Sequence, residues 1–184
     1  MRAALTTLTP GMAAALTVVT TTDSVAAAKM LRDAVVAAKL SAPDSIREET
    51  IRSFYWWEGR VQNESEVRLS FDTTEPFAAA STIILAAHNY DTPMVIAPTD
   101  RPEHHYWKGV LQGDEALAED LAATRLVACA QLSATELSVK TVTAAKSAVE
   151  TKLRGRAVTW VPIQGNQPYL DWLDAETMLP KKEL

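Results

Sequence analysis

The order of strand and helix patterns along residues 16–97 limits the fold more than any other feature of this sequence. Residues 16–22 (LTVVTTT) and 49–60 are rich in β-branched and aromatic residues, and residues 66–72 alternate polar and apolar side chains; all three patterns favour strands. Residues 24–40 and 76–87 have apolar side chains at helical spacing, which predicts two helices. Residues 94–97 form a short apolar run that predicts a fourth strand. This order predicts an α+β fold, the ferredoxin-like split βαβ sandwich.

An aromatic hairpin is expected between the second and third strands. Phe54, Tyr55, Trp56 and Trp57 are followed by Gly59, and Gly59 together with the polar run at 62–65 is predicted to form the hairpin tip. One small domain cannot enclose four neighbouring rings, and such rings are enriched in interface cores. The cluster therefore predicts an obligate assembly of chains, with ordinary core packing as the alternative for at least one ring.

A degenerate second copy of the same pattern is expected after a linker. Residues 66–73 (EVRLSFDT) resemble 136–141 (ELSVKT), and each segment precedes a predicted helix. We divide the chain into a tail (1–14), a ferredoxin-like unit (15–98), a linker (99–108), a second unit with a terminal helix (109–175) and a tail (176–184). Each unit would have a thin core, so the two are expected to pack through their sheets or with other chains. An unrelated insertion is the alternative to a repeat.

Charge and composition argue against several classes of function. The net charge of −5 carries no block of like charges, which argues against nucleic-acid binding and a polybasic membrane anchor, and the apolar stretches are too short for a membrane span. The single cysteine, Cys129, forbids an intrachain disulfide and suits the cytoplasm. Import into an organelle directed by residues 1–12 is the alternative location. Nucleophile-elbow, zinc-protease and phosphate-loop motifs are missing, so we expect no enzymatic activity.

Four segments, in family order, resemble the CutA divalent-cation-tolerance proteins. Residues 53–61 (SFYWWEGRV) are similar to the family's S-I-Y-x-W-E-G-K-I, and 66–74 (EVRLSFDTT) to E-V-x-L-x-x-K-T-T. Residues 88–93 (HNYDTP) resemble H-P-Y-x-x-P, and 165–173 (GNQPYLDWL) resemble G-N-x-x-Y-L-x-W-L. The family places its last helix directly after the H-P-Y strand, whereas residues 98–163 intervene here. A fused double unit would explain this departure.

The resemblance implies a homotrimer of ferredoxin-like units with a role in tolerance of divalent metal ions, copper among them. Motif matching gives His88 and Cys129 as candidate metal ligands; the alternatives are a helix C-terminal histidine and a small core residue. The family's likeness to PII signalling proteins makes clefts between subunits the expected ligand site. Residues expected at these clefts or the trimer interface are Phe54, Tyr55, Trp56, Trp57, Glu58, Gly59, Tyr90, Tyr169 and Trp172. The alternative functions are a metal-free structural or signalling scaffold and, more remotely, an enzyme of the dimeric α+β barrel type.

Overall fold

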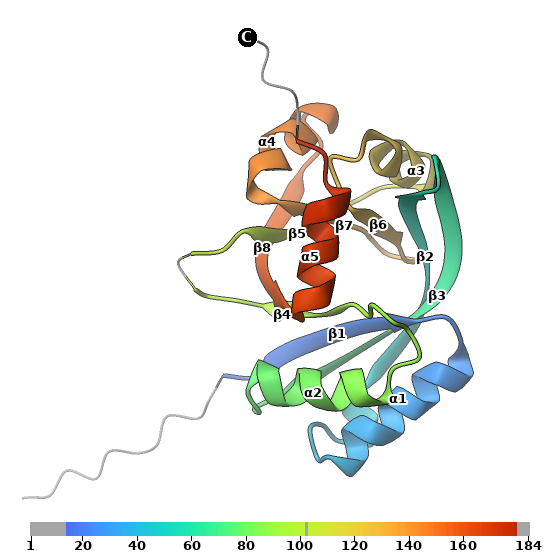
Figure 1. The fold of residues 1–184 in the computed structure, drawn as a ribbon, viewed down its shortest axis with the longest axis vertical. Coiled ribbons are helices and arrows are strands. Elements are labelled where there is room, and N and C mark those ends of the chain that lie inside the picture. The colour runs from blue at the N-terminus through green and yellow to red at the C-terminus, as the bar shows by residue number, and fades with distance from the viewer. Residues whose placement is uncertain (1–13, 102, 180–184) are drawn as a thin grey trace, which may run out of the picture.

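Two consecutive β-α-β-β-α-β segments and a final helix form the computed structural model, which describes residues 14–101 and 103–179 (Figure 1). The first segment contains β1 (Leu16–Thr22), α1 (Val25–Ala37), a 3-10 turn (Pro43–Ser45), β2 (Arg47–Trp57), β3 (Arg60–Thr73), α2 (Phe77–Ala87) and β4 (Val95–Pro98). The second contains β5 (Tyr106–Leu111), α3 (Glu115–Thr124), β6 (Cys129–Leu132), β7 (Leu137–Val142), α4 (Thr143–Lys152) and β8 (Val158–Gly165), and α5 (Gln167–Glu176) follows. The predicted α+β class is confirmed.

The strands of both segments close into one antiparallel barrel. Within the described residues the strand order is β1-β3-β2-β6-β7-β5-β8-β4, with β4 pairing back to β1. If the four strands of a segment are numbered along the chain, they lie across the sheet in the order four, one, three, two in both segments. The segments join where β2 pairs with β6 and where β4 pairs with β8. The aromatic hairpin of β2 and β3 thus finds a strand partner in its own chain.

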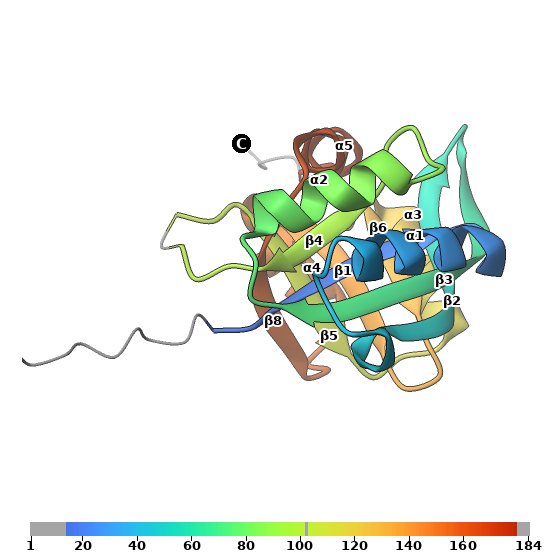
Figure 2. The ribbon, with the colours of Figure 1, turned by 90° about the horizontal axis from the view of Figure 1, so that it is seen from below.

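Apolar side chains on the outer face of the barrel pack under the helices. Val18, Leu69 and Phe71 belong to a core beneath α1 and α2, which lie side by side on this part of the sheet (Figure 2). Leu137 and Val139 belong to a second core beneath α3 and α4. The transfer of these side chains out of water is the main favourable term in holding helices on a sheet. A third core, which includes Leu170 and Leu173, attaches α5 to the barrel from the other side of β4, because Ile96 belongs to it while its neighbours Val95 and Ala97 belong to the first core. The full buried set of this third core is Met94, Ile96, Ala128, Ile163, Tyr169, Leu170 and Leu173.

Part of the inner face of the barrel is polar. Successive side chains of a strand point to opposite faces, so the neighbours of the outer core residues point inward. Glu66, Gln131, Ser138 and Lys140 are inward-facing and at most 8% exposed. Alternation of this kind is typical of a strand with one face in water, but here closure of the barrel removes the polar face from water. Each polar group inside therefore needs a hydrogen-bond partner.

Several predicted boundaries differ from the structure. The polar run at 62–65 is not the hairpin tip: it lies inside β3 and pairs with β2, and the turn is at Glu58 and Gly59, whose φ angles are 50° and 82°. β5 begins at Tyr106, within the predicted linker 99–108. The predicted import segment 1–12 and all of the first tail except residue 14 lie outside the described residues, as do residues 180–184 of the second tail. Among the described helices, none combines the length and apolar character needed to cross a membrane.

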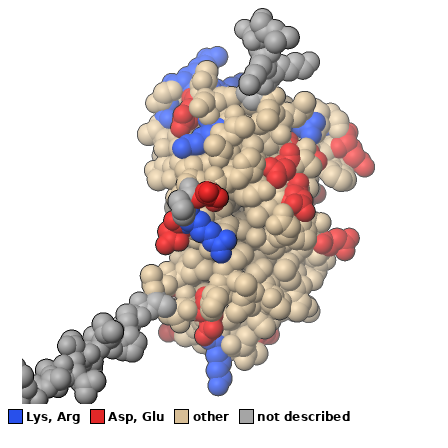
Figure 3. Space-filling model, turned by 60° about the vertical axis from the view of Figure 1, so that its left-hand side comes forward, with Lys and Arg blue, Asp and Glu red and all other residues tan. Residues whose placement is uncertain are grey.

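Charged side chains form no continuous field on the face seen in Figure 3. Aspartate and glutamate side chains gather toward the right of this view, several lysine and arginine side chains lie at its upper left, and wide uncharged areas lie between them. Both signs of charge are therefore present on this face.

Candidate functional site

A cleft of about 450 Å³ opens between the first segment, β6 and α5. Its volume lies in the range of sites that hold small organic ligands. The walls come from both segments of the chain, so neither segment forms the cleft alone. Its lining residues are Thr21, Asp23, Ser53, Tyr55, Trp57, Glu64, Glu66, Tyr90, Thr92, Met94, Cys129, Gln131, Tyr169 and Trp172.

Aromatic rings form one wall of this cleft. Tyr169 and Trp172, one helical turn apart on α5, stack with ring centroids 5.6 Å apart and an interplanar angle of 23°. Tyr55 of β2 meets Trp172 edge-on at 6.5 Å. Asn166 fixes the start of α5, because its Oδ1 accepts a hydrogen bond from the Val95 amide at 2.9 Å. Its amide nitrogen also donates to a backbone carbonyl of the segment before β4 at 3.0 Å. The rings therefore stand on a helix that is tied to the barrel.

The cleft lining also contains a buried carboxylate. Glu66 is 8% exposed; the Ser53 hydroxyl donates to its Oε2, and the Tyr90 hydroxyl donates to its Oε1 at 2.9 Å. Burial, reinforced by the charge of Glu66, raises the pKa of Tyr90. Burial and a hydrogen bond to Glu64 raise the pKa of Tyr55. Both phenols therefore stay neutral at physiological pH, beside carboxylates that make the cleft electronegative.

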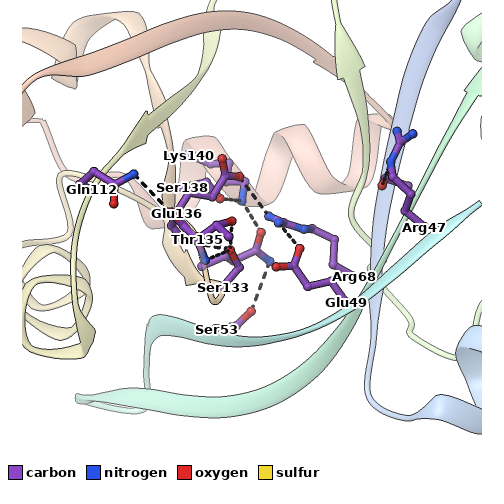
Figure 4. Close-up of polar contacts among 12 residues, drawn as sticks. Arg47, Glu49, Ser53, Arg68, Gln112, Ser133, Thr135, Glu136, Ser138 and Lys140 are labelled. Atoms are coloured by element: carbon purple, nitrogen blue, oxygen red, sulfur yellow. Dashed lines mark hydrogen bonds and ion pairs between the residues drawn. The ribbon is translucent and has the colours of Figure 1, made fainter.

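A chain of polar contacts runs from the cleft into the barrel. Gln131 donates from Nε2 to the Ser53 hydroxyl at 3.2 Å, and its Oε1 accepts a hydrogen bond from Lys140 Nζ. Lys140 also donates to the Ser138 hydroxyl at 3.0 Å, as Figure 4 shows. Burial lowers the pKa of Lys140 to about 8, with the neighbouring Cys129 acting in the opposite direction. Lys140 is thus a buried cation held by neutral partners, behind the cleft wall.

Cys129 belongs to the cleft lining and is buried. Its Sγ is 3.7 Å from the Tyr169 hydroxyl oxygen, and its side chain is 5% exposed. Burial raises the pKa of the thiol, although Lys140 partly opposes this shift. A raised pKa keeps the sulfur protonated, which disfavours nucleophilic chemistry.

A second cavity of about 260 Å³ is lined by both signs of charge. Arg68 forms ion pairs with Glu49 at 2.5 Å and with Glu136 at 3.6 Å. Figure 4 shows Arg68 and these two carboxylates together inside the barrel. Lys108 also lines the cavity, and burial lowers its pKa. Because its charges largely pair with one another, this cavity is a weaker candidate for a ligand site than the cleft.

The structure brings six of the sequence-predicted site residues into the cleft and leaves five elsewhere. Those in the lining are Tyr55, Trp57, Tyr90, Cys129, Tyr169 and Trp172. Phe54 is instead fully buried in the core under α3, and Trp56 is half-buried on β2. Glu58 and Gly59 form the hairpin turn. His88 lies beside the cleft but is not part of its lining.

His88 has no free nitrogen for a metal ion in this arrangement. Its Nδ1 accepts a hydrogen bond from the Tyr90 amide at 3.1 Å, so the proton resides on Nε2. Nε2 in turn donates to the Thr21 carbonyl oxygen at 3.0 Å and lies 3.2 Å from the Thr20 hydroxyl oxygen. Burial lowers the pKa of His88, which agrees with a neutral ring. The histidine therefore anchors the segment after α2 to β1.

No ready-made metal centre exists in the part of the chain that the structure describes. Groups of three or more histidine, cysteine, aspartate or glutamate side chains able to hold a metal ion are missing there. A tight site needs three or four ligands. Any metal bound at Cys129 would therefore have to recruit ligands by rearrangement or from another molecule.

Sequence reasoning missed Ser53, Glu66, Gln131 and Lys140. The period of two that places Phe54 in the core also points Ser53 and Tyr55 to the other face, so these two could have been paired from the pattern. The places of Gln131 and Lys140 could not have been predicted from the sequence pattern, because their contacts depend on the register between β6 and β7.

Known relatives cover part of this chain. "Protein CutA 1, chloroplastic" from Oryza sativa subsp. japonica is 42% identical over 72 residues, which are 39% of this chain and 40% of the relative. "Divalent-cation tolerance protein CutA" from Archaeoglobus fulgidus is 38% identical over 53 residues, 28% of this chain and 52% of the relative. The chain thus spans about half or less of the length of the curated relatives it matches.

The chain is also similar to solved structures and matches a protein family. The structure of the "Periplasmic divalent cation tolerance protein CutA" from Archaeoglobus fulgidus aligns with a TM-score of 0.43 and 24% identity, over 60% of this chain and 97% of that one. CutA1 from Oryza sativa aligns with a TM-score of 0.42 and 33% identity, over 48% and 83%. The family described as "CutA1 divalent ion tolerance protein" matches residues 16–112, from β1 to the residue after β5. Because this match covers more than half of the chain, the protein belongs to the CutA1 divalent ion tolerance family.

Proposed function

We propose that the protein acts in divalent-cation tolerance by binding a cation in the cleft between β2, β3, β6 and α5, without catalysis. One observation carries this proposal: Glu66 is buried in the cleft wall, accepts hydrogen bonds from two hydroxyl groups and has no ion-pair partner in the described chain. A buried carboxylate without a counter-charge is costly. A cationic ligand would supply that counter-charge.

The nucleophilic groups near the cleft favour binding over catalysis. The Cys129 thiol has a raised pKa, and the Lys140 amine donates to Gln131 and Ser138 and is not part of the cleft lining. A catalytic nucleophile or base needs to reach its substrate. These groups instead stabilise the barrel interior.

Copper is the metal that the family resemblance suggests, and Cys129 is the residue we propose to hold it. Cys129 and Met94 both line the cleft, and thiolate and thioether sulfur atoms are the ligands that Cu(I) prefers. We do not carry His88 forward as a ligand, because both of its ring nitrogens are engaged. Binding would displace the thiol proton, so affinity should increase with pH.

The test is a Cu(I) titration of three proteins in competition with a chelator of known affinity. We expect wild type and His88→Gln to bind one equivalent and Cys129→Ala to lose at least tenfold in affinity. His88→Gln keeps a polar side chain at the position and serves as the matched control. Equal Cu(I) affinity in wild type and Cys129→Ala would refute the sulfur site, as would the absence of Cu(I) binding in the wild type.

A homotrimer remains our proposal for the assembly. Residues 60–66 of β3 pair only with β2, since β1 pairs with β3 over residues 67–73, so this stretch leaves a strand edge open to another chain. Trp57, beside the same hairpin turn, is 51% exposed. Open edges and exposed rings are typical of assembly surfaces. Light scattering should give the mass of three chains; a stable monomer at micromolar concentration would refute the trimer.

A metal-free scaffold is the second candidate function, and the same open edge supports it. A scaffold would assemble and yet show no specific cation binding, so light scattering and the Cu(I) titration together separate the two functions. The cytoplasmic location is likewise a proposal, supported by one buried unpaired cysteine. The names of the relatives give other compartments, chloroplast and periplasm, for those proteins.

A further inference from the structure

We infer that the natural occupant of the cleft is an organic cation, an ammonium group carried on an aromatic or apolar frame. This inference rests on the proposed function, namely that the cleft binds a cation, and goes beyond the copper site at Cys129, because it names a second chemical class of cation. It extends to a molecule much larger than a metal ion. Charge, ring geometry and size each support it.

The charge around the cleft has one sign. Asp23, Glu64 and Glu66 belong to the lining, and the described lining residues include neither lysine nor arginine. The nearest buried cation, Lys140, donates to Gln131 and Ser138 rather than to Glu66. An anionic ligand would meet repulsion here, whereas a cation would pair with Glu66, which accepts hydrogen bonds from two hydroxyl groups but forms no ion pair within the described residues.

The rings of the cleft suit an ammonium group with carbon substituents. The stack of Tyr169 and Trp172 and the edge-on Tyr55 present π-systems beside the carboxylates. Aromatic faces attract ammonium ions and shelter the carbon frame to which they are attached. The phenols of Tyr55 and Tyr90 remain protonated because their pKa values are raised, so they add no negative charge of their own.

The volume of the cleft favours an organic cation over a bare metal ion. The cleft has a volume of about 450 Å³, and the described part of the chain contains no cluster of three metal-ligating side chains. A metal ion alone would leave most of this space to water. The second cavity offers an internal contrast: it is smaller, and Arg47, Arg68 and Lys108 line it together with carboxylates.

Three probes that share a phenyl ring and a short carbon arm test the inference on the full chain. Phenethylamine carries a positive charge, 2-phenylethanol is neutral and 3-phenylpropionate is negative. Isothermal titration gives each affinity, and quenching of Trp57 and Trp172 fluorescence reports binding in the cleft. We expect phenethylamine to bind at least tenfold more tightly than either of the other two probes.

Variants that remove one negative charge test whether the carboxylates of the cleft bind the ammonium group of phenethylamine. Glu66→Gln keeps the shape of the side chain, and we expect it to weaken phenethylamine binding about tenfold while leaving 2-phenylethanol binding unchanged. Glu119→Gln, an exposed change on α3, is the matched control and should bind like wild type. If Glu66→Gln fails to fold, Glu64→Gln at the same cleft should show the same direction of change.

The outcomes distinguish this inference from the proposed function. Equal or tighter binding of 2-phenylethanol or 3-phenylpropionate would refute the cationic class and leave a cleft that binds ligands. Absence of phenethylamine binding at millimolar concentration would also refute it. Cu(I) binding that depends on Cys129 would still support the proposed function in either case.

Discussion

Replacement of Lys140 by methionine should change how the stability of this protein depends on pH. Lys140 is 1% exposed, and its ammonium donates to the neutral side chains of Gln131 and Ser138. Burial lowers its pKa from 10.5 to about 8. At 1.36 kcal/mol per pKa unit, keeping this amine charged in the folded state costs about 3 kcal/mol relative to the unfolded chain.

The sign of the effect follows from proton binding in the two states. Below pH 8 Lys140 is protonated in both states, so its full cost is present and does not vary with pH. Between pH 8 and 10.5 the unfolded chain holds a proton that the folded protein has released. The free energy of unfolding therefore rises with pH in this window. From pH 8 to 9.5 the wild type should gain about 2 kcal/mol relative to Lys140→Met.

Urea unfolding followed by circular dichroism, at intervals from pH 7 to 9.5, measures this difference. Lys140→Met also deprives Gln131 and Ser138 of a donor, but that loss shifts the whole curve without changing its slope. Lys29→Met, at an exposed helix position, is the matched control and should run parallel to wild type. Parallel curves for wild type and Lys140→Met, within about 0.5 kcal/mol, would show that Lys140 is not the buried cation described above.

Three further substitutions test the packing of the barrel. Gly109→Ala should cost about 1–3 kcal/mol, because the added carbon would lie 2.7 Å from the Trp160 ring. Phe54→Ala should cost about 3–5 kcal/mol, because the ring is fully buried between β2 and α3. Asn166→Ala should cost about 1–3 kcal/mol, because it leaves the Val95 amide without its acceptor at the start of α5. Urea unfolding monitored by tryptophan fluorescence measures all three.

Each of these substitutions has a control at a position where the side chain makes few contacts. Gly59→Ala meets no atom within 4 Å and should cost only about 1 kcal/mol, from its positive φ of 82°. Met30→Ala, at an exposed side chain on α1, should change stability by less than about 0.5 kcal/mol. Gln167→Ala removes one surface contact to Asp171 and should change stability by a few tenths of a kcal/mol. If a control variant lost as much free energy of unfolding as the substitution it is paired with, the packing described above would be contradicted.

The sequence predicted the elements of this fold well because their signals are local. Alternation at Val67, Leu69 and Phe71 marks the strand face that packs under helices, and Ser24 begins α1 by accepting a hydrogen bond from the Ala27 amide at 3.2 Å. Turn chemistry also placed Gly59 at a bend. The polar run that follows was misplaced because β3 continues past the turn with polar residues on both faces.

The candidate site was only half predictable. Motif resemblance selected Tyr55 and Trp172, which meet in the cleft, because both lie in segments with a strong family pattern. Glu66 was interpreted as one of the polar residues on the exposed face of a strand. Its burial follows from barrel closure, which depends on pairs such as β2 with β6, far apart in the sequence. His88 shows the same limit, since its partner Thr21 lies 67 residues away.

Joining both segments of the barrel in one polypeptide has a consequence for stoichiometry. When two identical subunits close a barrel, a site at one end recurs at the other, and dilution separates the pair. Here the two segments are tethered, so their meeting is unimolecular and insensitive to dilution. They also differ in sequence, which leaves an acidic aromatic cleft and a separate cavity of mixed charge rather than two copies of one site. Each molecule should therefore take up a single equivalent of ligand, whatever larger assembly it joins.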